Sequence, residues 1–323
     1  MKKLKFKLNI LQKVLPLFLI IFLFLFNFNR AWAVETRQDK TSTIQFEPEN
    51  ALLATNIQSM VIPAKEHIKK TTGLSLDKPV LIKLCSSTAS FSNITGITNV
   101  SVQGIAISEY NMIIINAENI FSKSTSDIEH LIEHEITHLV LGNNIISGSG
   151  KHLPRWFNEG VAQWVSEGAS ELFSSSYQGS LQSAFLTERL LPFSTLSESF
   201  PPEQSGFILA YAQSLSFIEF LVEENGEDKL NSLMQLLKSE KDFYRAFQQV
   251  YFFPLEQAEQ EWVKTKKKST YTYDYFLATN INTIIDSFVG FTAFCVFIIF
   301  YFRNKARKKK MAESELENEP EIS

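Results

Sequence analysis

The chain has 323 residues, of which 13% are aromatic and only 20% charged, so it is not a disordered protein, which would be poor in aromatic residues and rich in charge. Residues 34–280 contain 19 Lys and Arg against 29 Asp and Glu, a net charge of −10, which excludes nucleic-acid binding through a positive face. Cys85 and Cys295 are the only cysteines, so a disulfide scaffold and a cysteine-rich zinc cluster are excluded as well. Any bound metal must therefore be held by histidine and carboxylate.

The first 33 residues have the three-part layout of a secretory signal peptide. Five lysines precede an apolar run from Leu15 to Phe26, and the triplet Ala31-Trp32-Ala33 offers small residues for cleavage after Ala33. The apolar run is shorter than the roughly 20 residues that a membrane-spanning helix needs. We therefore predict a signal peptide over residues 1–33, with an uncleaved anchor as the alternative.

A second apolar segment, from Ile281 to Phe302, predicts a transmembrane helix. At about 1.5 Å per residue it is long enough to cross a hydrocarbon core of about 30 Å. Six basic residues follow within 303–310, and such a flank stays in the cytoplasm. We expect contact with the lipid bilayer through this helix, an outer region over 34–280 and a cytoplasmic tail over 303–323. The alternative is a buried helix of a soluble protein.

The first part of the outer region, residues 34–79, predicts a polar, loose lead-in over 34–46 and then a helix. The apolar spacing from Pro48 to Thr72 is helical, Gly73 is a stop signal, and Pro63 should kink the helix or divide it.

Strands and then helices are predicted beyond this first part. The strand-like runs are 80–85, 100–107 and 112–115, with a turn at 109–111 joining the last two. From residue 124 to residue 268 the apolar spacing is helical almost throughout. The predicted fold class is α+β, with a small mixed sheet followed by a helical half.

The stretch from Ser126 to Gly142 predicts an amphipathic helix. Ser126 and Glu129 have the spacing of a capping box, so the helix should begin at Asp127, and Gly142 offers a natural stop. His134 and His138 lie four residues apart and therefore on one face, a separation that lets two imidazoles bind one Zn²⁺. Glu135, next to the first histidine, is placed to act on a water molecule at the metal without being a ligand.

A third ligand is predicted on a second helix, which Pro154 is well placed to open. Glu159 is flanked there by Trp156, Phe157 and Val161, which should pack into the core. A carboxylate among packed apolar residues needs a partner, because an unpaired buried charge is costly. A zinc ion shared with His134 and His138 would be that partner.

The two motifs, from His134 to His138 and from Pro154 to Ala162, resemble those of the gluzincin metallopeptidases. The closest likeness is to the branch called peptidase MA-like, which has a thermolysin-type catalytic core, and we assign residues 80–268 to such a domain. The resemblance implies zinc held by His134, His138 and Glu159, with Glu135 as the general base. It also implies that Tyr211, on the family's third helix, donates a hydrogen bond to the oxyanion. Residues 104–116 resemble the edge strand that lies alongside the bound peptide.

Four other residues have less definite roles. His130 extends the stripe of His134, and we expect it outside the ligand set, although it could compete as a ligand. Asn158 could orient the site through hydrogen bonds or have no such role. His67 and His152 are interpreted as surface residues.

The sequence thus predicts a membrane-anchored, extracytoplasmic, zinc-dependent peptidase with one Zn²⁺ per chain and a peptide or protein substrate. No aminopeptidase signature is present, so the choice between exopeptidase and endopeptidase stays open. Three alternatives remain: a catalytically silent, zinc-stabilised binding module at the membrane, a zinc hydrolase of other substrates, and a structural membrane protein without metal. The oligomeric state is left open.

Overall fold

The computed structural model describes residues 34–99, 102–146, 153–167, 175–270 and 273–317. The predicted signal segment 1–33, the beginning of the predicted strand 100–107 and His152 lie outside these residues. Two compact units are present, a first that ends at Trp262 and a second that begins at Val263.

A five-stranded mixed sheet forms the first part of the first unit. Its strands are β1 (Glu35–Gln38), β2 (Ser42–Phe46), β3 (Val80–Cys85), β4 (Gly104–Ile107) and β5 (Met112–Asn116), in the order β1-β2-β3-β5-β4. Strands β2, β3 and β5 are parallel, whereas β1 and β4 are antiparallel to their neighbours. This confirms the α+β class and places β4 at an edge. Cys85 is buried in β3, as expected for a strand residue.

The prediction of a loose lead-in over residues 34–46 is wrong, because these residues form β1 and β2. In β2, the side chains of Ser42, Ile44 and Phe46 are buried and alternate with half-buried residues. This is the period of a strand with one face on the core. Because polar residues alternate with these buried ones, the segment is polar on average, and its average polarity does not reveal a strand. Asp39 closes the turn between the two strands by accepting hydrogen bonds from the backbone N–H groups of Thr41 and Ser42.

Helix α2 (Ala51–Thr72) connects β2 to β3 after a single 3₁₀ turn, η1 (Pro48–Asn50). It ends at Gly73, which has a left-handed φ of 68°, as predicted. Pro63 does not divide the helix. The residues around it on the inner face, Met60, Val61 and Ala64, are buried, and this packing holds the helix together across the proline.

Helix α5 (Thr125–Leu141) begins earlier than predicted. The capping box is formed by Ser124 and Asp127, whose side chains each accept a hydrogen bond from the other's backbone N–H, and not by Ser126 and Glu129. Aspartate at the third helical position can thus replace the more usual glutamate. The α-helix ends before Gly142, which has a right-handed φ of −59°, so the chain continues into the π-helical turn η3 (Gly142–Ile146) instead of stopping there. Three short elements lie between the strands and before this helix: α3 (Thr88–Thr95) follows β3, η2 (Ser108–Tyr110) connects β4 to β5, and α4 (Ala117–Ile120) lies between β5 and α5.

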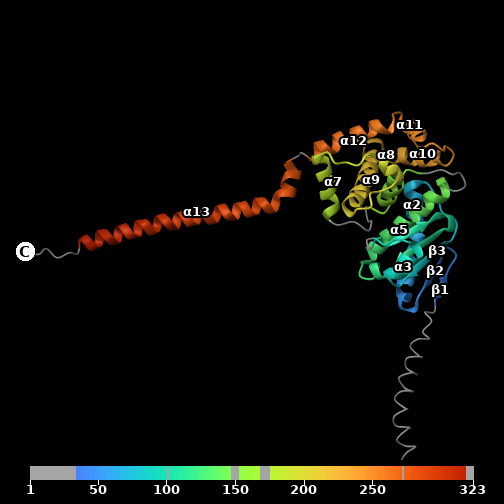
Figure 1. Cartoon of the computed structure of the whole chain (residues 1–323), viewed down its shortest axis with the longest axis horizontal. Helices are drawn as coiled ribbons and strands as arrows, with labels where there is room; N and C mark the ends of the chain where they lie inside the picture. Colours follow the sequence, from blue (N-terminus) through green and yellow to red (C-terminus); the bar gives the residue numbers. More distant parts are fainter. Residues whose placement is uncertain (1–33, 100–101, 147–152, 168–174, 271–272, 318–323) are drawn as a thin grey trace, which may run out of the picture. The chain divides into compact units, whose positions relative to one another are not determined.

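The rest of the first unit is helical, as predicted, and in Figure 1 helices α8 to α11 are gathered apart from the strands. The helices are α6 (Arg155–Val165), α7 (Ser175–Thr187), α8 (Phe193–Glu198), α9 (Gln204–Asn225), α10 (Glu227–Leu237), α11 (Phe243–Tyr251) and α12 (Leu255–Thr270), the last of which continues into the second unit. Trp156 of α6 is fully buried among aromatic rings. Its ring centroid lies between 4.9 and 5.6 Å from those of Phe157, Phe193, Phe217 and Phe243. This cluster fixes the position of α6.

The second unit contains α13 (Tyr273–Glu317). Its segment Asn280–Lys308 is a candidate membrane span with a mean hydropathy of 2.1 and no buried residues in its most apolar part. Cys295 lies in this segment. Helix α9 is also long and apolar enough to cross a membrane, but its apolar window is mostly buried, as in the core helix of a soluble domain.

Candidate metal centre

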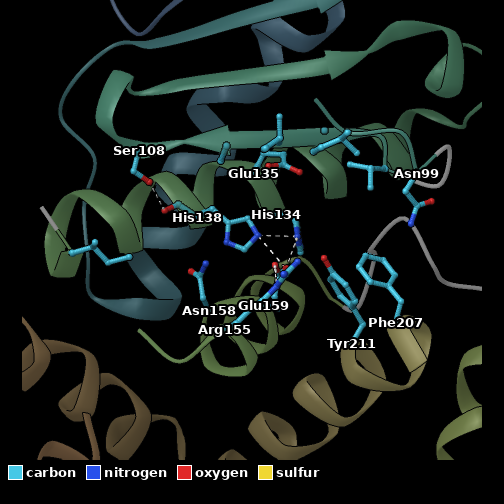
Figure 2. A pocket seen from close by; sticks show the side chains of 16 residues that line it. Asn99, Ser108, His134, Glu135, His138, Arg155, Asn158, Glu159, Phe207 and Tyr211 are labelled. Atoms are coloured by element: carbon cyan, nitrogen blue, oxygen red, sulfur yellow. Dashed lines mark hydrogen bonds and ion pairs between the residues drawn. The ribbon is translucent and has the colours of Figure 1, made fainter. Parts of the chain in front are cut away.

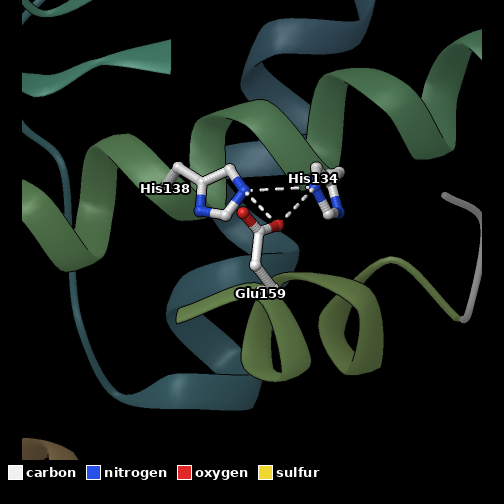
Figure 3. Close-up of side chains that lie close together, drawn as sticks. All are labelled: His134, His138 and Glu159. Atoms are coloured by element: carbon white, nitrogen blue, oxygen red, sulfur yellow. Dashed lines mark hydrogen bonds and ion pairs between the residues drawn. The ribbon is translucent and has the colours of Figure 1, made fainter. Parts of the chain in front are cut away.

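Two helices bring the three predicted ligands together, with both histidines coming from α5 and Glu159 from α6 (Figure 3). The Nε2 atoms of His134 and His138 lie 3.1 Å apart. Glu159 Oε2 lies 3.8 Å from His134 Nε2 and 3.4 Å from His138 Nε2. All three side chains are largely buried. Three lone-pair donors therefore converge on one point.

The spacing of these atoms fits a zinc ion. Ligands about 2.0–2.2 Å from a tetrahedral centre lie about 3.3–3.6 Å from one another, and the observed separations of 3.1, 3.4 and 3.8 Å surround that range. Glu159 Oε2 is buried and has no hydrogen-bond partner among the described residues. A cation bound between the three side chains would satisfy this oxygen, whose nearest polar neighbours are the two imidazole nitrogens.

The electrostatics of the cluster also favour a cation. Burial and the neighbouring His138 together lower the pKa of His134 to about 3, although the Glu159 carboxylate opposes this shift. Burial acts in the same direction on His138, but the Glu159 carboxylate outweighs it and raises the pKa to about 9. Burial alone would raise the pKa of Glu159, whereas the two imidazoles and the Arg155 guanidinium lower it to about 2. The ionised Glu159 carboxylate is thus balanced by the Arg155 guanidinium and by a proton shared with the imidazoles, and a metal ion can take the place of that proton.

The other histidines of the described chain do not join this cluster. His130 is half-buried and lies outside the group of His134, His138 and Glu159, in agreement with the prediction. His67 is not a plain surface residue as predicted: it is half-buried, and its Nε2 lies 3.2 Å from the carbonyl oxygen of Val165. This contact joins α2 to the end of α6, a tertiary relation that the local sequence does not show.

A cavity of about 370 Å³ opens beside the three ligands and also contains Glu135 (Figure 2). The Glu135 side chain is buried, and its Oε2 has no hydrogen-bond partner among the described residues. Burial raises the pKa of Glu135 to about 7, while His138 and the backbone N–H of Ala106 oppose the rise. A carboxyl group with a pKa near 7 can both take up and release a proton at neutral pH.

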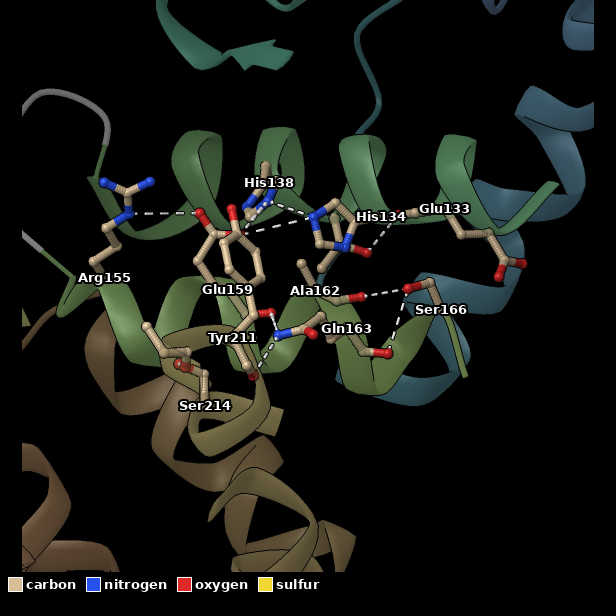
Figure 4. A network of polar contacts seen from close by, with 12 residues as sticks. Glu133, His134, His138, Arg155, Glu159, Ala162, Gln163, Ser166, Tyr211 and Ser214 are labelled. Carbon is tan, nitrogen blue, oxygen red and sulfur yellow. Dashed lines mark hydrogen bonds and ion pairs between the residues drawn. The ribbon is translucent and has the colours of Figure 1, made fainter. Parts of the chain in front are cut away.

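Tyr211 of α9 lines the same cavity, and Figure 2 shows its hydroxyl directed toward the ligand cluster. Its position relative to Glu159 is set by Gln163 of α6 (Figure 4). The Gln163 Nε2 donates hydrogen bonds to the carbonyl oxygens of Tyr211, at 3.2 Å, and of Glu159, at 3.3 Å. Asn158 also lines the cavity; its Oδ1 is buried without a hydrogen-bond partner, as is the Nδ1 of the neighbouring His138. As a hydrogen-bond acceptor, the Asn158 side chain contributes to the raised pKa of His138.

Sequence reasoning assigned no role to Arg155, Ser108 or Phe207, yet all three line the cavity. The Arg155 Nε lies 3.8 Å from Glu159 Oε1, on the side of the carboxylate away from the histidines (Figure 4). The i, i+4 spacing of Arg155 and Glu159 on the predicted second helix could have indicated this pair. Ser108 and Phe207 come from distant segments, and no local pattern indicates them.

Two histidines on one helix, a glutamate on the next and a buried carboxylate beside them are compatible with the zinc site of a metallopeptidase. The family model of the Peptidase MA superfamily matches residues 62–268. The chain belongs to that superfamily, which confirms the resemblance to a peptidase MA-like gluzincin. No curated protein matches the chain. The likeness to a thermolysin-type core stays a prediction.

Proposed function

We propose that the protein is a zinc-dependent peptidase that hydrolyses peptide bonds in the cavity beside His134, His138 and Glu159. The observation that carries the proposal is the convergence of three ligand atoms next to the buried carboxylate of Glu135, in one cavity open to a substrate. The family of the chain supports the same activity.

A zinc ion held by His134 Nε2, His138 Nε2 and Glu159 Oε2 would polarise the carbonyl of the scissile bond and make nearby water more acidic. Glu135 acts as the general base. It takes a proton from the attacking water and passes it to the departing amine. We assign to the Tyr211 hydroxyl the donation of a hydrogen bond to the oxyanion that forms on the attacked carbonyl.

Peptidase activity is proposed to lie outside the cytoplasm, on a domain that we assign to residues 80–268. The candidate span Asn280–Lys308 is followed by Lys309 and Lys310, and its last part already contains four basic residues. A basic flank holds that end of a span in the cytoplasm. The part of the chain that precedes the span would then face the outside. A signal segment over residues 1–33 would direct the chain there.

The test is the substitution Glu135→Gln in the full chain, compared with Glu133→Gln. Glu133 lies on the same helix but does not line the cavity. Each variant is assayed for zinc content and for digestion of a peptide library, with ester and amide substrates in parallel. We expect about one zinc per chain in all forms and a rate of peptide hydrolysis about 10²–10⁴-fold lower for Glu135→Gln only. Zinc-loaded wild-type protein that cleaves no peptide, or that cleaves only the other substrates, would contradict the proposal.

A further inference from the structure

Strand β4 lies against the helix that holds the histidines, and its alternate residues are small. Gly104 and Ala106 have the two-residue spacing by which side chains share a face of a strand, and Ser108, the first residue of η2, follows two residues later. Each of the three contacts a residue of the metal-binding helix or its end. None of the three contacts involves the ligand atoms of the proposed zinc site.

Gly104 lies against the carboxylate of Glu135. A Cβ atom added to Gly104 would lie 2.9 Å from Glu135 Oε1, 3.1 Å from its Cγ and 3.2 Å from its Cδ. Real Cβ contacts essentially never fall below 3.0 Å. Because Glu135 is only 3% exposed, its side chain has little room to move aside. A side chain of any size at position 104 would therefore displace the carboxylate.

Ala106 supplies a hydrogen-bond donor to the same carboxylate. The N–H of Asn116 donates a hydrogen bond to the carbonyl oxygen of Gln103. In an antiparallel pair only every second residue exchanges hydrogen bonds with the neighbouring strand, so Ile105 and Ile107 bond to β5 and Ala106 does not. The N–H of Ala106 therefore points away from β5, to the free edge, where it donates to Glu135. Since Glu135 Oε2 has no hydrogen-bond partner among the described residues, we assign this contact to Oε1.

Ser108 holds the other end of the helix. Its hydroxyl donates to the carbonyl oxygen of His138 over 3.3 Å. It also lies directly against Gly142, where an added Cβ would come within 1.9 Å of Ser108 Oγ. These two contacts hold the end of the strand beside the helical turn that carries His138.

We propose that Gly104 and Ala106 are positioning residues for the general base: the glycine leaves the space that the Glu135 carboxylate occupies, and the Ala106 N–H anchors its Oε1. The carboxylate is thereby held beside the cavity that it lines, where it exchanges a proton with substrate and water. The catalytic role of Glu135 in this inference rests on the proposed function, whereas the anchoring contact does not.

The first experiment is the substitution Gly104→Ala in the full chain. To restore an ordinary contact of 3.4 Å the carboxylate must move by about 0.5 Å, and misplacement by about 1 Å costs about 10²-fold in rate. We expect kcat to fall about tenfold or more, with KM and zinc content unchanged. Gly179→Ala is the control, because an added Cβ there has nothing within 4 Å. Its kcat should be that of the wild type.

A double substitution separates positioning from general damage. The side chain of Glu135→Asp is one methylene shorter and leaves room for the added methyl group, so Gly104→Ala should cost little further activity in that background. An unchanged kcat for Gly104→Ala, or the same loss in both backgrounds, would overturn the inference. Loss of zinc from Gly104→Ala would overturn it as well, since it would show damage to the ligands.

A readout without activity tests the anchor itself. Hydrogen–deuterium exchange at the Ala106 amide is measured by fragmentation mass spectrometry on the full chain in detergent, in wild type and in Glu135→Ala. We expect protection of this amide to fall about tenfold or more, as for the loss of a hydrogen bond to a charged group, while the Ile105 amide is unaffected. Equal protection in both proteins would overturn the anchor. If the anchor is present but the wild type cleaves no peptide, the proposed function has failed and the contact stands.

Discussion

The substitution Gly160→Ala should reverse the usual effect of replacing a glycine inside a helix. Gly160 follows the ligand Glu159 in α6 and faces α9. In an exposed helix, alanine is more favourable than glycine by about 1 kcal/mol. At Gly160, however, the added Cβ would lie 2.6 Å from the carbonyl oxygen of Ser214 and 2.8 Å from Cγ1 of Ile218. The nearest atom belongs to the backbone and cannot rotate away.

The size of the effect follows from these distances. To reach an ordinary contact of 3.4 Å, α6 and α9 must separate by about 0.8 Å at this point. Overpacking a well-packed core costs about 1–3 kcal/mol, and the rigid backbone contact places Gly160→Ala near the upper value. After the gain in helix propensity, the net loss in free energy of unfolding is about 2 kcal/mol. This corresponds to a fall in Tm of about 4–8 °C for a domain of this size.

Thermal unfolding of the full chain measures this effect, with Gly179→Ala as the matched control. Gly179 lies in α7, where an added Cβ has nothing within 4 Å, so its replacement should raise Tm by about 2–4 °C. The same samples are titrated with zinc, because a displaced α6 carries Glu159 with it, and affinity should fall for Gly160→Ala alone. A rise in Tm for both variants would refute the reasoning from close packing.

Three further predictions follow from the caps and charges around the site. Ser124→Ala should lower the free energy of unfolding by about 1 kcal/mol, while Ser126→Ala, at an exposed position, should change it little; chemical denaturation distinguishes them. Hydrogen bonds from Ser124 lower the pKa of Asp127, so this cap stabilises the fold above pH about 4. The stabilisation is lost as the pH falls through the lowered pKa. The difference in free energy of unfolding between wild type and Ser124→Ala should therefore shrink at low pH. Arg155→Met removes the partner of Glu159 Oε1 and should weaken zinc binding about tenfold in competition with a chelator, whereas an unchanged affinity would mean that this ion pair does not orient the ligand.

The parts of the structure that the sequence predicted are those set by local periodicity. The four-residue spacing of His134 and His138 fixes their common helix face in any α-helix. Glu159 was predicted from its place among packed residues, because a buried carboxylate requires a partner. The structure brings all three together. Gly73 likewise ended its helix through the left-handed conformation that glycine adopts without strain.

The parts that were missed depend on contacts between distant segments or on a choice between near-equal local signals. Strand β2 is stabilised by pairing with β3, and its short polar sequence gives little sign of that pairing. Ser124 and Ser126 could each cap α5, and Ser124 is the cap because the Asp127 carboxylate accepts a hydrogen bond from its backbone N–H. The contact of Gly104 with Glu135 joins a strand to a helix, and no spacing in the sequence relates them.

X-ray absorption at the zinc edge on the zinc-loaded full chain tests the central claim most directly. We predict about one zinc per chain, with two imidazole nitrogens and one or two oxygens at about 2.0–2.2 Å and no sulfur. The Glu159→Gln variant should lose an oxygen from this set or fail to retain the metal. A sulfur ligand, a zinc signal independent of His134 and His138, or no stoichiometric zinc would contradict the account.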